Sequence, residues 1–350
     1  MRVLVTGNEG YIGSILVSLL QGAGHKVFGL DTGLFRECAL TTFSRPPTLR
    51  KDVRDVELRH LEGYDALIHL AGLANDPLGD LDPPLTYEVN HVATVRLAEL
   101  AKRAGIRRFL FASSCSVYGA AGEDLIDEQT APNPVTPYAH SKFLSEQDLL
   151  RLADASFCPV FLRAATAYGV SPYLRFDLAL NNLVAWAYTT QRVYLKSDGA
   201  AWRPFVHIQD IARAYLGLLE APAFSVRSQA FNVGATDENY RIRELAKLVR
   251  QGVPGSRLEY AADASPDQRS YRVSCDKIRR VLTDYRPRWN ARTGVEEVYE
   301  VIRESGLHAE DFEGARYNRI AHVRRLMEQG QLDPDLRWAP QQAVAAGGTL

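Results

Sequence analysis

Residues 3–20, VLVTGNEGYIGSILVSLL, join a short apolar, β-branched run to an amphipathic stretch through Gly7, Gly10 and Gly13. Such a loop turns tightly, lets the backbone approach a pyrophosphate, and directs the first amide groups of a helix toward negative charge. Three glycines alone often mark only a turn, but here a strand is expected before them and a helix after them. The stretch therefore predicts the start of a dinucleotide-binding fold.

The same alternation of strands and helices continues through the first half of the chain. Apolar runs expected as strands occupy residues 2–6, 26–31, 66–70, 108–113 and 159–164. Stretches with apolar residues three and four apart, expected as helices, occupy residues 12–21, 87–104 and 138–153. Strands alternating with helices of this length form a parallel sheet covered on both faces. The predicted fold class is α/β, a Rossmann-type doubly wound parallel sheet with a smaller C-terminal α/β substrate lobe.

The regular alternation stops after about residue 165, where turn-rich pieces separate shorter elements. We expect a cofactor domain of residues 1–165 with returning segments near 205–235, and a discontinuous substrate lobe within 166–300 that includes a helix over 241–253. Residues 301–350 are expected to form a helical extension and tail, with a basic helix over 315–330 that lies on the substrate lobe or on a neighbouring subunit.

Composition and charge exclude several classes of partner. The 350 residues carry 41 Lys and Arg against 42 Asp and Glu, so no overall field points to nucleic acid or to a membrane surface. No apolar run approaches the roughly 18 residues that a membrane span needs, and no charged leader precedes the first strand. The four cysteines lack the spacing of a zinc site or a disulfide scaffold. A cytoplasmic protein without a metal site is expected.

The second expected strand, KVFGLD, ends at Asp31. A carboxylate there can accept hydrogen bonds from the adenosine ribose and would repel a 2′-phosphate, which favours NAD over NADP. The nearby Arg36 leaves NADP open, and a simple strand-end turn residue is the alternative role for Asp31. The pattern GxxxxGK[ST] is absent, which removes the commonest phosphoryl-transfer alternative.

Two later stretches carry candidate chemistry. FASSCSVYG, residues 111–119, places hydroxyls and a thiol at the end of an expected strand, and TPYAHSKFLSEQ, residues 136–147, places Tyr138 and Lys142 four residues apart on an expected helix. That spacing puts the two side chains on one face, one turn apart. A lone Y-x-x-x-K is common on solvated helices, but here it follows a dinucleotide loop.

With these motifs in order, the chain resembles the extended short-chain dehydrogenase/reductases, the nucleotide-sugar epimerase and dehydratase family, over roughly residues 1 to 290. The matching pieces are TGNEGYIG (6–13), Asp31, KDVRD (51–55), HLAG (69–72), VNHVAT (89–94), SSCSVYG (113–119), YAHSK (138–142), LRAATAYG (162–169) and RPFVHIQDIARA (203–214). Their order and spacing are far more specific than any one motif.

The resemblance implies roles for individual residues. Tyr138 would be the general acid/base, Lys142 would hold the nicotinamide ribose and lower the pKa of the tyrosine, and Ser114, aligned on VYG, would bind the sugar oxygen. NAD contacts are implied for Gly7, Gly10, Tyr11, Ile12, Gly13, Asp31, Asp52, Val53, Leu70, Ala71, Gly72, Asn90, Ser113, Tyr138, Lys142 and Ala165. Substrate contacts are implied for Ser114, Ser116, Thr166, Asn182, Arg203 and Arg269.

The substrate side departs from the family pattern. Ala164 and Ala165 stand where many relatives have aromatics, and Thr166 replaces an asparagine. The usual arginine before the DxSKI-like segment is missing, and Arg269 or Arg272 is expected to supply its charge. In the run after Arg203, His207 is expected to be an interior imidazole and Asp210 the N-cap of a helix.

Residues 115 and 116 discriminate between reactions. Dehydratases and uronate decarboxylases of the family carry a Glu before VYG, and many dehydratases an Asp as well, whereas this chain has Cys115 and Ser116. The thiol of Cys115 is expected to be a small, packed apolar group rather than a reactive one. Ser113 is expected to hydrogen-bond the backbone rather than to act in catalysis. Neither Cys115 nor Ser116 can act as a carboxylate acid or base, so the pattern is closer to the 4-epimerases.

The leading hypothesis is an NAD-dependent epimerase that acts on a nucleotide sugar at C4 through a transient 4-keto sugar. A keto-sugar reductase or dehydrogenase, a dehydratase of the same family, and a catalytically silent NAD-binding sensor or scaffold remain alternatives. A homodimer is expected from the resemblance, formed through the helices over 87–104 and 138–153.

Overall fold

Seven parallel strands form the central sheet, in the order β11-β7-β5-β4-β1-β2-β3. This computed structural model describes residues 1–74, 82–265 and 269–339. The strands are β1 (Arg2–Thr6), β2 (Lys26–Asp31), β3 (Thr48–Arg50), β4 (Ala66–His69), β5 (Arg108–Ser114), β7 (Cys158–Ala164) and β11 (Gln229–Val233). The five predicted strands are confirmed to within one residue at each end, and β3 and β11 were not predicted.

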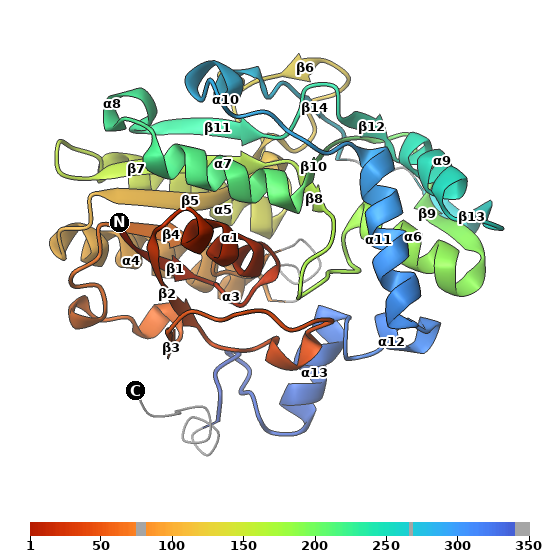
Figure 1. Ribbon diagram of the computed structural model, residues 1–350, viewed down its shortest axis with the longest axis horizontal. Coiled ribbons are helices and arrows are strands. Elements are labelled where there is room, and N and C mark those ends of the chain that lie inside the picture. The colour runs from red at the N-terminus through yellow and green to blue at the C-terminus, as the bar shows by residue number, and fades with distance from the viewer. Residues whose placement is uncertain (75–81, 266–268, 340–350) are drawn as a thin grey trace.

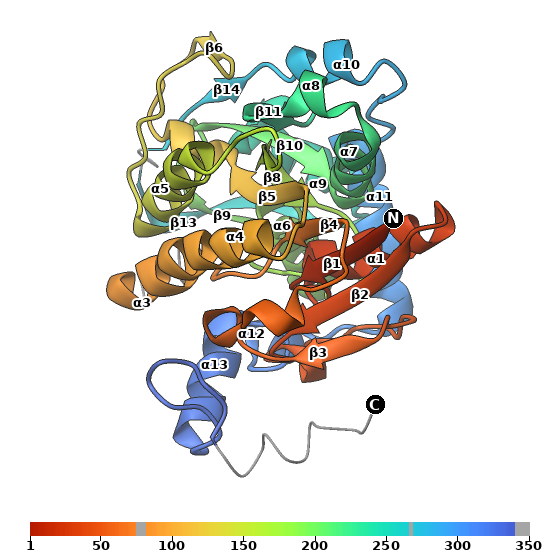
Figure 2. The ribbon, with the colours of Figure 1, turned by 90° about the vertical axis from the view of Figure 1, so that its left-hand side faces the viewer.

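Helices cover both faces of the sheet (Figure 2), and the packing of the β1 side chains follows this arrangement. Val3 and Val5 pack with α1 (Tyr11–Gly22) and α7 (Ile208–Glu220), whereas Leu4 points to the other face, into the cluster of α4 (Ala93–Arg103) and α5 (Pro137–Arg151). Successive side chains of a strand alternate between faces, so one apolar run fills two cores. The predicted fold class is confirmed.

The predicted helix over 87–104 is not one continuous α-helix. It comprises the end of α3 (Pro83–Tyr87), a π-helical turn η4 (Glu88–Val92) and α4. Single π-turns inside helices arise where one extra residue is accommodated, often at functional sites.

A smaller lobe is packed beside the carboxyl ends of the strands (Figure 1). Its core joins α6 (Ala179–Thr190), α9 (Ile242–Gly252) and α11 (Ala291–Ser305) through residues such as Leu183, Val249 and Val298. The helix predicted over 241–253 is therefore confirmed as α9. The lobe also holds the pair β9 (Arg192–Ser197) with β13 (Arg257–Ser265), and the three strands β12 (Asn239–Arg241), β10 (Trp202–His207) and β8 (Thr166–Tyr168).

Short elements complete the described part of the chain. They are β6 (Leu125–Ile126), β14 (Arg272–Val273), α8 (Ala223–Val226), α10 (Asp276–Val281), and the 3-10 turns η1 (Arg36–Cys38), η2 (Val53–Asp55), η3 (Leu58–His60) and η5 (Cys115–Tyr118). None of the helices in the described ranges is long and apolar enough to cross a membrane.

The prediction that Asp210 caps α7 is wrong. The helix begins at Ile208, and its N-cap is His207, whose Nδ1 accepts a hydrogen bond from Gln209 N at 3.2 Å. The buried carboxylate of Asp210 instead accepts from the backbone amides of Arg288 (3.0 Å) and Trp289 (3.1 Å). Asp210 therefore ties the first turn of α7 to the chain that leads into α11.

The C-terminal extension only partly follows its prediction. α12 (Ala309–Glu313) does lie on the lobe, where Phe312 meets Phe176 and Trp186. The basic helix is shorter than expected, α13 (Arg319–Glu328), and returns to the loop after β2, where the His322 ring contacts Leu34 O at 2.8 Å (Figure 1). The predicted tail beyond residue 339 lies outside the described residues.

Candidate active site

A cavity of about 500 Å³ runs along the carboxyl ends of β1, β2, β4, β5 and β7. In parallel sheets of this type a crevice opens there because the loops after neighbouring strands diverge to opposite faces. The predicted site residues that line it are Gly7, Gly10, Tyr11, Ile12, Gly13, Asp31, Asp52, Val53, Leu70, Ala71, Gly72, Ser113, Ser114, Ser116, Tyr138, Lys142, Ala165, Thr166, Arg203 and Arg269. The cavity therefore brings together residues that the sequence scatters over more than 260 positions, from Gly7 to Arg269.

The glycine-rich loop has the close packing that a dinucleotide cradle requires. Gly7 has φ +71°, and a Cβ on it would stand 2.8 Å from Ala71 N; a Cβ on Gly13 would stand 2.2 Å from Gly7 O. Gly10 is the N-cap of α1 and offers no side-chain cap, so the first amides of the helix face the cavity without one. This backbone fits the pyrophosphate of a dinucleotide.

Two carboxylates meet near the end of β2, Asp31 from the strand itself and Glu9 from the loop after β1. Asp31 accepts hydrogen bonds from Glu9 N (3.0 Å) and Gly33 N (2.8 Å), and burial raises its pKa. The buried Glu9 carboxylate is held by Arg50 (Nη1 to Oε2, 2.7 Å) and Arg45 (Nε to Oε1, 3.1 Å). Carboxylates at this position suit ribose hydroxyls and oppose a 2′-phosphate. Arg36 also lines the cavity.

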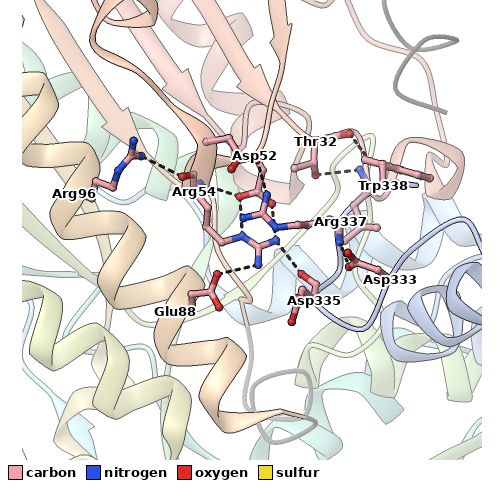
Figure 3. A network of polar contacts seen from close by, with 11 residues as sticks. Thr32, Asp52, Arg54, Glu88, Arg96, Asp333, Asp335, Arg337 and Trp338 are labelled. Atoms are coloured by element: carbon pink, nitrogen blue, oxygen red, sulfur yellow. Dashed lines mark hydrogen bonds and ion pairs between the residues drawn. The ribbon is translucent and has the colours of Figure 1, made fainter. Parts of the chain in front are cut away.

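Asp52 is held by an arginine of its own turn. Arg54 donates to it from its backbone N (2.8 Å), Nε (3.0 Å) and Nη2 (2.7 Å), as Figure 3 shows. Burial pushes the pKa of Asp52 up, but the hydrogen bonds from Arg54 outweigh it and keep the pKa below its usual range. Arg54 also donates to Asp335 O at 2.9 Å, so the C-terminal extension takes part in this contact.

Asn90 acts behind the cavity wall instead of on it. Its side chain accepts from Leu73 N (2.7 Å) and donates to Leu73 O (3.0 Å), and a Cβ on Gly72 would stand 2.7 Å from its Oδ1. Asn90 therefore shapes the loop after β4 and is not among the cavity-lining residues, and its contact with the cofactor stays a prediction.

Tyr138 and Lys142 reach the cavity from the first two turns of α5. Thr136 caps the helix and Pro137 begins it, which fixes where the tyrosine emerges. The ammonium of Lys142, 4% exposed, lies 4.8 Å from the ring centroid of Phe111 and 5.8 Å from that of Tyr138. Burial lowers the pKa of Lys142 to about 8.

The hydroxyls at the end of β5 differ in their surroundings. Ser114 Oγ accepts a hydrogen bond from Ser116 N at 3.1 Å. Ser116 Oγ is buried and has no hydrogen-bond partner within the described parts of the chain. Both residues line the cavity, and the hydroxyl of Ser116 retains its donor and acceptor capacity for a ligand.

A buried polar network holds the end of β5 from behind. Ser113 Oγ donates to the Glu146 carboxylate, which Arg163 binds through Nη2 at 2.6 Å; Arg163 also donates to Tyr118 Oη at 3.0 Å. The hydroxyl of Ser113 thus bonds a side chain and not the backbone as expected. The network joins β5, α5 and β7 and orients the strand end that carries Ser114.

Cys115 is a packed thiol. It is 1% exposed, its Sγ contacts Arg163 O at 3.2 Å, and burial raises its pKa far above the ordinary value. A thiol held protonated in this way is not a nucleophile.

At the other end of the cavity, Arg203 lies over the ring of Tyr271 with 5.2 Å between Cζ and the centroid, and its Nη1 donates to Trp202 O at 2.8 Å. Arg269 lines the cavity, whereas Arg272 is not among its lining residues. Asn182 is also outside the lining, because its amide donates to Phe176 O at 2.7 Å and closes the turn before α6.

The cavity residues that the sequence interpretation missed include the polar side chains of Arg175, Asp177, Tyr271 and Arg319. Arg175 and Asp177 form an ion pair of 2.6 Å, and the spacing R-x-D in LRFDL could have drawn attention to it. Arg319 comes from the C-terminal extension, and no sequence pattern links it to this site. Among the described residues, no three His, Cys, Asp or Glu side chains gather in a group suited to a metal ion.

Comparison with known proteins agrees with this geometry. Residues 3–234, which run from β1 through β11, match the model of the NAD dependent epimerase/dehydratase family. The chain belongs to this family. The family is NAD-dependent, so the expectation of NAD as the cofactor is confirmed.

Individual members of the NAD-dependent epimerase/dehydratase family resemble the chain over most of its length. A UDP-glucose 4-epimerase of Mycolicibacterium smegmatis is 30% identical over 87% of this chain and 99% of its own, and one of Bacillus subtilis is 28% identical over 85% and 94%. Among solved structures, MoeE5 with UDP-glucuronic acid and NAD covers 87% of this chain and all of its own at a TM-score of 0.73 and 28% identity. The Thermus thermophilus UDP-glucose 4-epimerase with NAD covers 87% and 99% at a TM-score of 0.72 and 27% identity.

Proposed function

We propose that this protein is an NAD-dependent nucleotide-sugar 4-epimerase. The observation that carries the proposal is the composition of the site around Ser114: Tyr138 and Lys142 share its cavity, while Cys115 and Ser116 occupy the positions where elimination would need carboxylates. Within the described lining of the cavity, the carboxylates are Glu9, Asp31, Asp52 and Asp177, and none lies at the end of β5.

The proposed chemistry divides into a hydride transfer and a proton transfer. NAD supplies a site that accepts a hydride from the sugar and returns it. Tyr138 Oη takes the proton of the C4 hydroxyl and gives it back, and Ser114 Oγ hydrogen-bonds the same sugar oxygen. Turnover of the keto sugar between the two transfers inverts the configuration at C4.

Lys142 supports Tyr138 by charge. Its ammonium lies beside the tyrosine ring in a site shielded from water, where an opposite charge is favoured more strongly than in bulk solvent. The same ammonium is well placed on the cavity wall to bind a ribose hydroxyl of the cofactor.

A UDP-hexose is the substrate class we favour. The curated relatives that match over most of their length are named UDP-glucose 4-epimerases. Arg203 and Arg269 give the distal end of the cavity two guanidinium groups, which suit the oxygens of a diphosphate. We also infer that residues 1–165 and 205–235 form the cofactor domain and that the lobe within 166–300 binds the nucleotide sugar.

The substitution Tyr138→Phe tests the proposal. Removing the phenol oxygen should lower turnover of UDP-glucose by about 100-fold or more, because proton transfer by a positioned group contributes that much. Binding of NAD, followed by calorimetric titration, should stay close to wild type. Tyr188→Phe, outside the described cavity lining, is the matched control. Full activity of Tyr138→Phe would refute the assignment.

The alternative activities can be distinguished by their products. A reductase or dehydrogenase changes the amount of reduced dinucleotide in step with product, a dehydratase forms a dehydrated sugar, and a scaffold converts nothing.

A thermal-shift screen against UDP-, GDP-, CDP-, ADP- and dTDP-sugars identifies the base, since a ligand of the native state raises its stability.

A further inference from the structure

Helix α13 is fixed against the loop that follows β2. The His322 ring contacts Leu34 O at 2.8 Å, Arg325 pairs with Glu37 at 3.2 Å, and the guanidinium of Arg319 lies 4.3 Å from the ring centroid of Phe35. Figures 1 and 2 both place this helix on the side of the molecule where β2 and the edge strand β3 lie.

The chain beyond α13 continues the attachment (Figure 3). Trp338 Nε1 donates to Thr32 O at 2.9 Å, Arg337 pairs with Asp55 at 2.5 Å, and Leu336 joins the lining of the cavity. These contacts reach two loops of the cofactor side, so the extension that carries Arg319 is attached there both within α13 and after it.

Arg319 lines the cavity and is half-buried, although a charged side chain is more stable in water. Within residues 1–74, 82–265 and 269–339 its guanidinium has no hydrogen bond and no ion pair, only the stacking contact with Phe35. Burial, with a further contribution from the charge of Arg175, lowers the pKa of Arg319 to about 10. A desolvated cation that no carboxylate contacts directly costs free energy, and a bound anion would recover part of it.

The charges near Arg319 indicate which part of a ligand it meets. Its cation interacts with Asp31, at the adenosine ribose end, and with Arg175 and Asp177. Asn181 Nδ2 donates both to Arg175 O (3.0 Å) and to Tyr11 Oη (3.3 Å), which places Arg175 beside the glycine-rich loop. Arg319 therefore lies within reach of the stretch between the ribose end and the first turn of α1.

We propose that Arg319 binds the pyrophosphate of NAD, so that the C-terminal extension supplies a side-chain contact to the phosphates that the glycine-rich loop holds through its backbone. The guanidinium can form charge-assisted hydrogen bonds to phosphate oxygens. Arg175 contributes positive charge nearby but already shares it with Asp177. The proposal rests on the NAD dependence of the family and not on the 4-epimerase activity.

The test is a calorimetric titration of NAD into dinucleotide-free protein. Arg319→Gln keeps a side chain over Phe35 but removes the charge, and we expect the Kd for NAD to rise by about 10- to 100-fold, since hydrogen bonds to charged groups contribute at that level. Arg319→Lys should recover part of the loss. The matched control is Arg324→Ala, which removes an exposed cation from the same helix and should leave the Kd unchanged.

Two further ligands separate this role from others. Adenosine lacks phosphate and should bind wild type and Arg319→Gln equally; weaker binding of adenosine would mean that Arg319 only supports the loop after β2. UDP should also bind both equally, and a selective loss of UDP would assign Arg319 to the substrate diphosphate. Either of these results, or an unchanged Kd for NAD in a folded Arg319→Gln, would overturn the proposal.

Discussion

At the residue scale, the burial of Lys142 lowers the stability of the folded protein at a position that the proposed chemistry requires. In the folded protein its pKa falls from the ordinary 10.5 to about 8, because burial disfavours the ammonium. Below pH 8 the group is protonated in both states, and the folded protein bears the full penalty. Between pH 8 and 10.5 the unfolded chain binds more protons, so stability rises with pH through this window.

The substitution Lys142→Met should therefore stabilise the cofactor-free protein near pH 7 while abolishing activity. We expect a gain of about 1–3 kcal/mol in the free energy of unfolding, and a smaller difference from wild type near pH 10. Urea denaturation at the two pH values measures both quantities. A loss of stability in Lys142→Met, or a difference that grows toward pH 10, would contradict this account.

A residue's place in the cavity was predictable where a motif fixes it, as for Gly7, Tyr138 and Lys142. The role of a residue was not predictable where a side chain has several possible partners at similar spacing. Asn182 closes a local turn, Asn90 supports Leu73, and Asp210 bonds amides nearly 80 positions away. Which partner each polar group takes depends on tertiary neighbours that the sequence does not place.

The first turn of α1 allows a prediction at the scale of an element. Gly13→Ala places a methyl group against Gly7 O, at 2.2 Å from backbone that cannot move without opening the loop. We expect it to destabilise the protein by about 1–3 kcal/mol or more and to weaken NAD binding. Thermal unfolding and calorimetric titration measure the two effects.

Gly22→Ala is the matched control on the same helix. A Cβ at Gly22 meets nothing within 4 Å, so this change should be neutral or stabilising by up to about 1 kcal/mol. Equal effects of the two substitutions would show that close packing of the loop is not what requires glycine at position 13.

Among elements, strands with continuous apolar runs were predicted well and short edge strands were not. β3 is only three residues long and half-buried, and β11 joins the sheet from a distant part of the chain. β3 pairs with β2 and β11 pairs with β7, so the register of each edge strand depends on its neighbour more than on its own sequence pattern.

At the scale of the whole molecule, α4 and α5 lie side by side on one face of the sheet (Figure 2). Near and along them the bulky apolar residues Val92, Leu144 and Leu150 are exposed. We propose this face as the interface of a homodimer, in line with the family resemblance.

Light scattering after size exclusion tests the dimer. Leu144→Glu should shift the protein toward monomer, because it introduces a charge into the proposed interface. Phe224→Glu, at an exposed site on α8, should leave the mass unchanged. A monomeric wild type, or a dimer that tolerates Leu144→Glu, would exclude this interface.

The parallel sheet covered on both faces, with a smaller lobe beside it, followed from the alternating pattern of the sequence. The return of the C-terminal extension to the cofactor side did not. Trp338 and Arg337 meet Thr32 and Asp55 across separations of 306 and 282 residues, through single contacts that leave no periodic signal. Arg319 was missed for the same reason.

The most direct test of the proposed function is the fate of the C4 hydrogen of UDP-glucose in deuterated water. We expect proton NMR to show an equilibrium mixture of UDP-glucose and its C4 epimer, with hydrogen and not deuterium at C4, and no net change in reduced dinucleotide. Hydrogen is retained because it leaves and returns as hydride. A dehydrated product, deuterium at C4, or reduced dinucleotide formed in step with product would refute the proposed 4-epimerase activity.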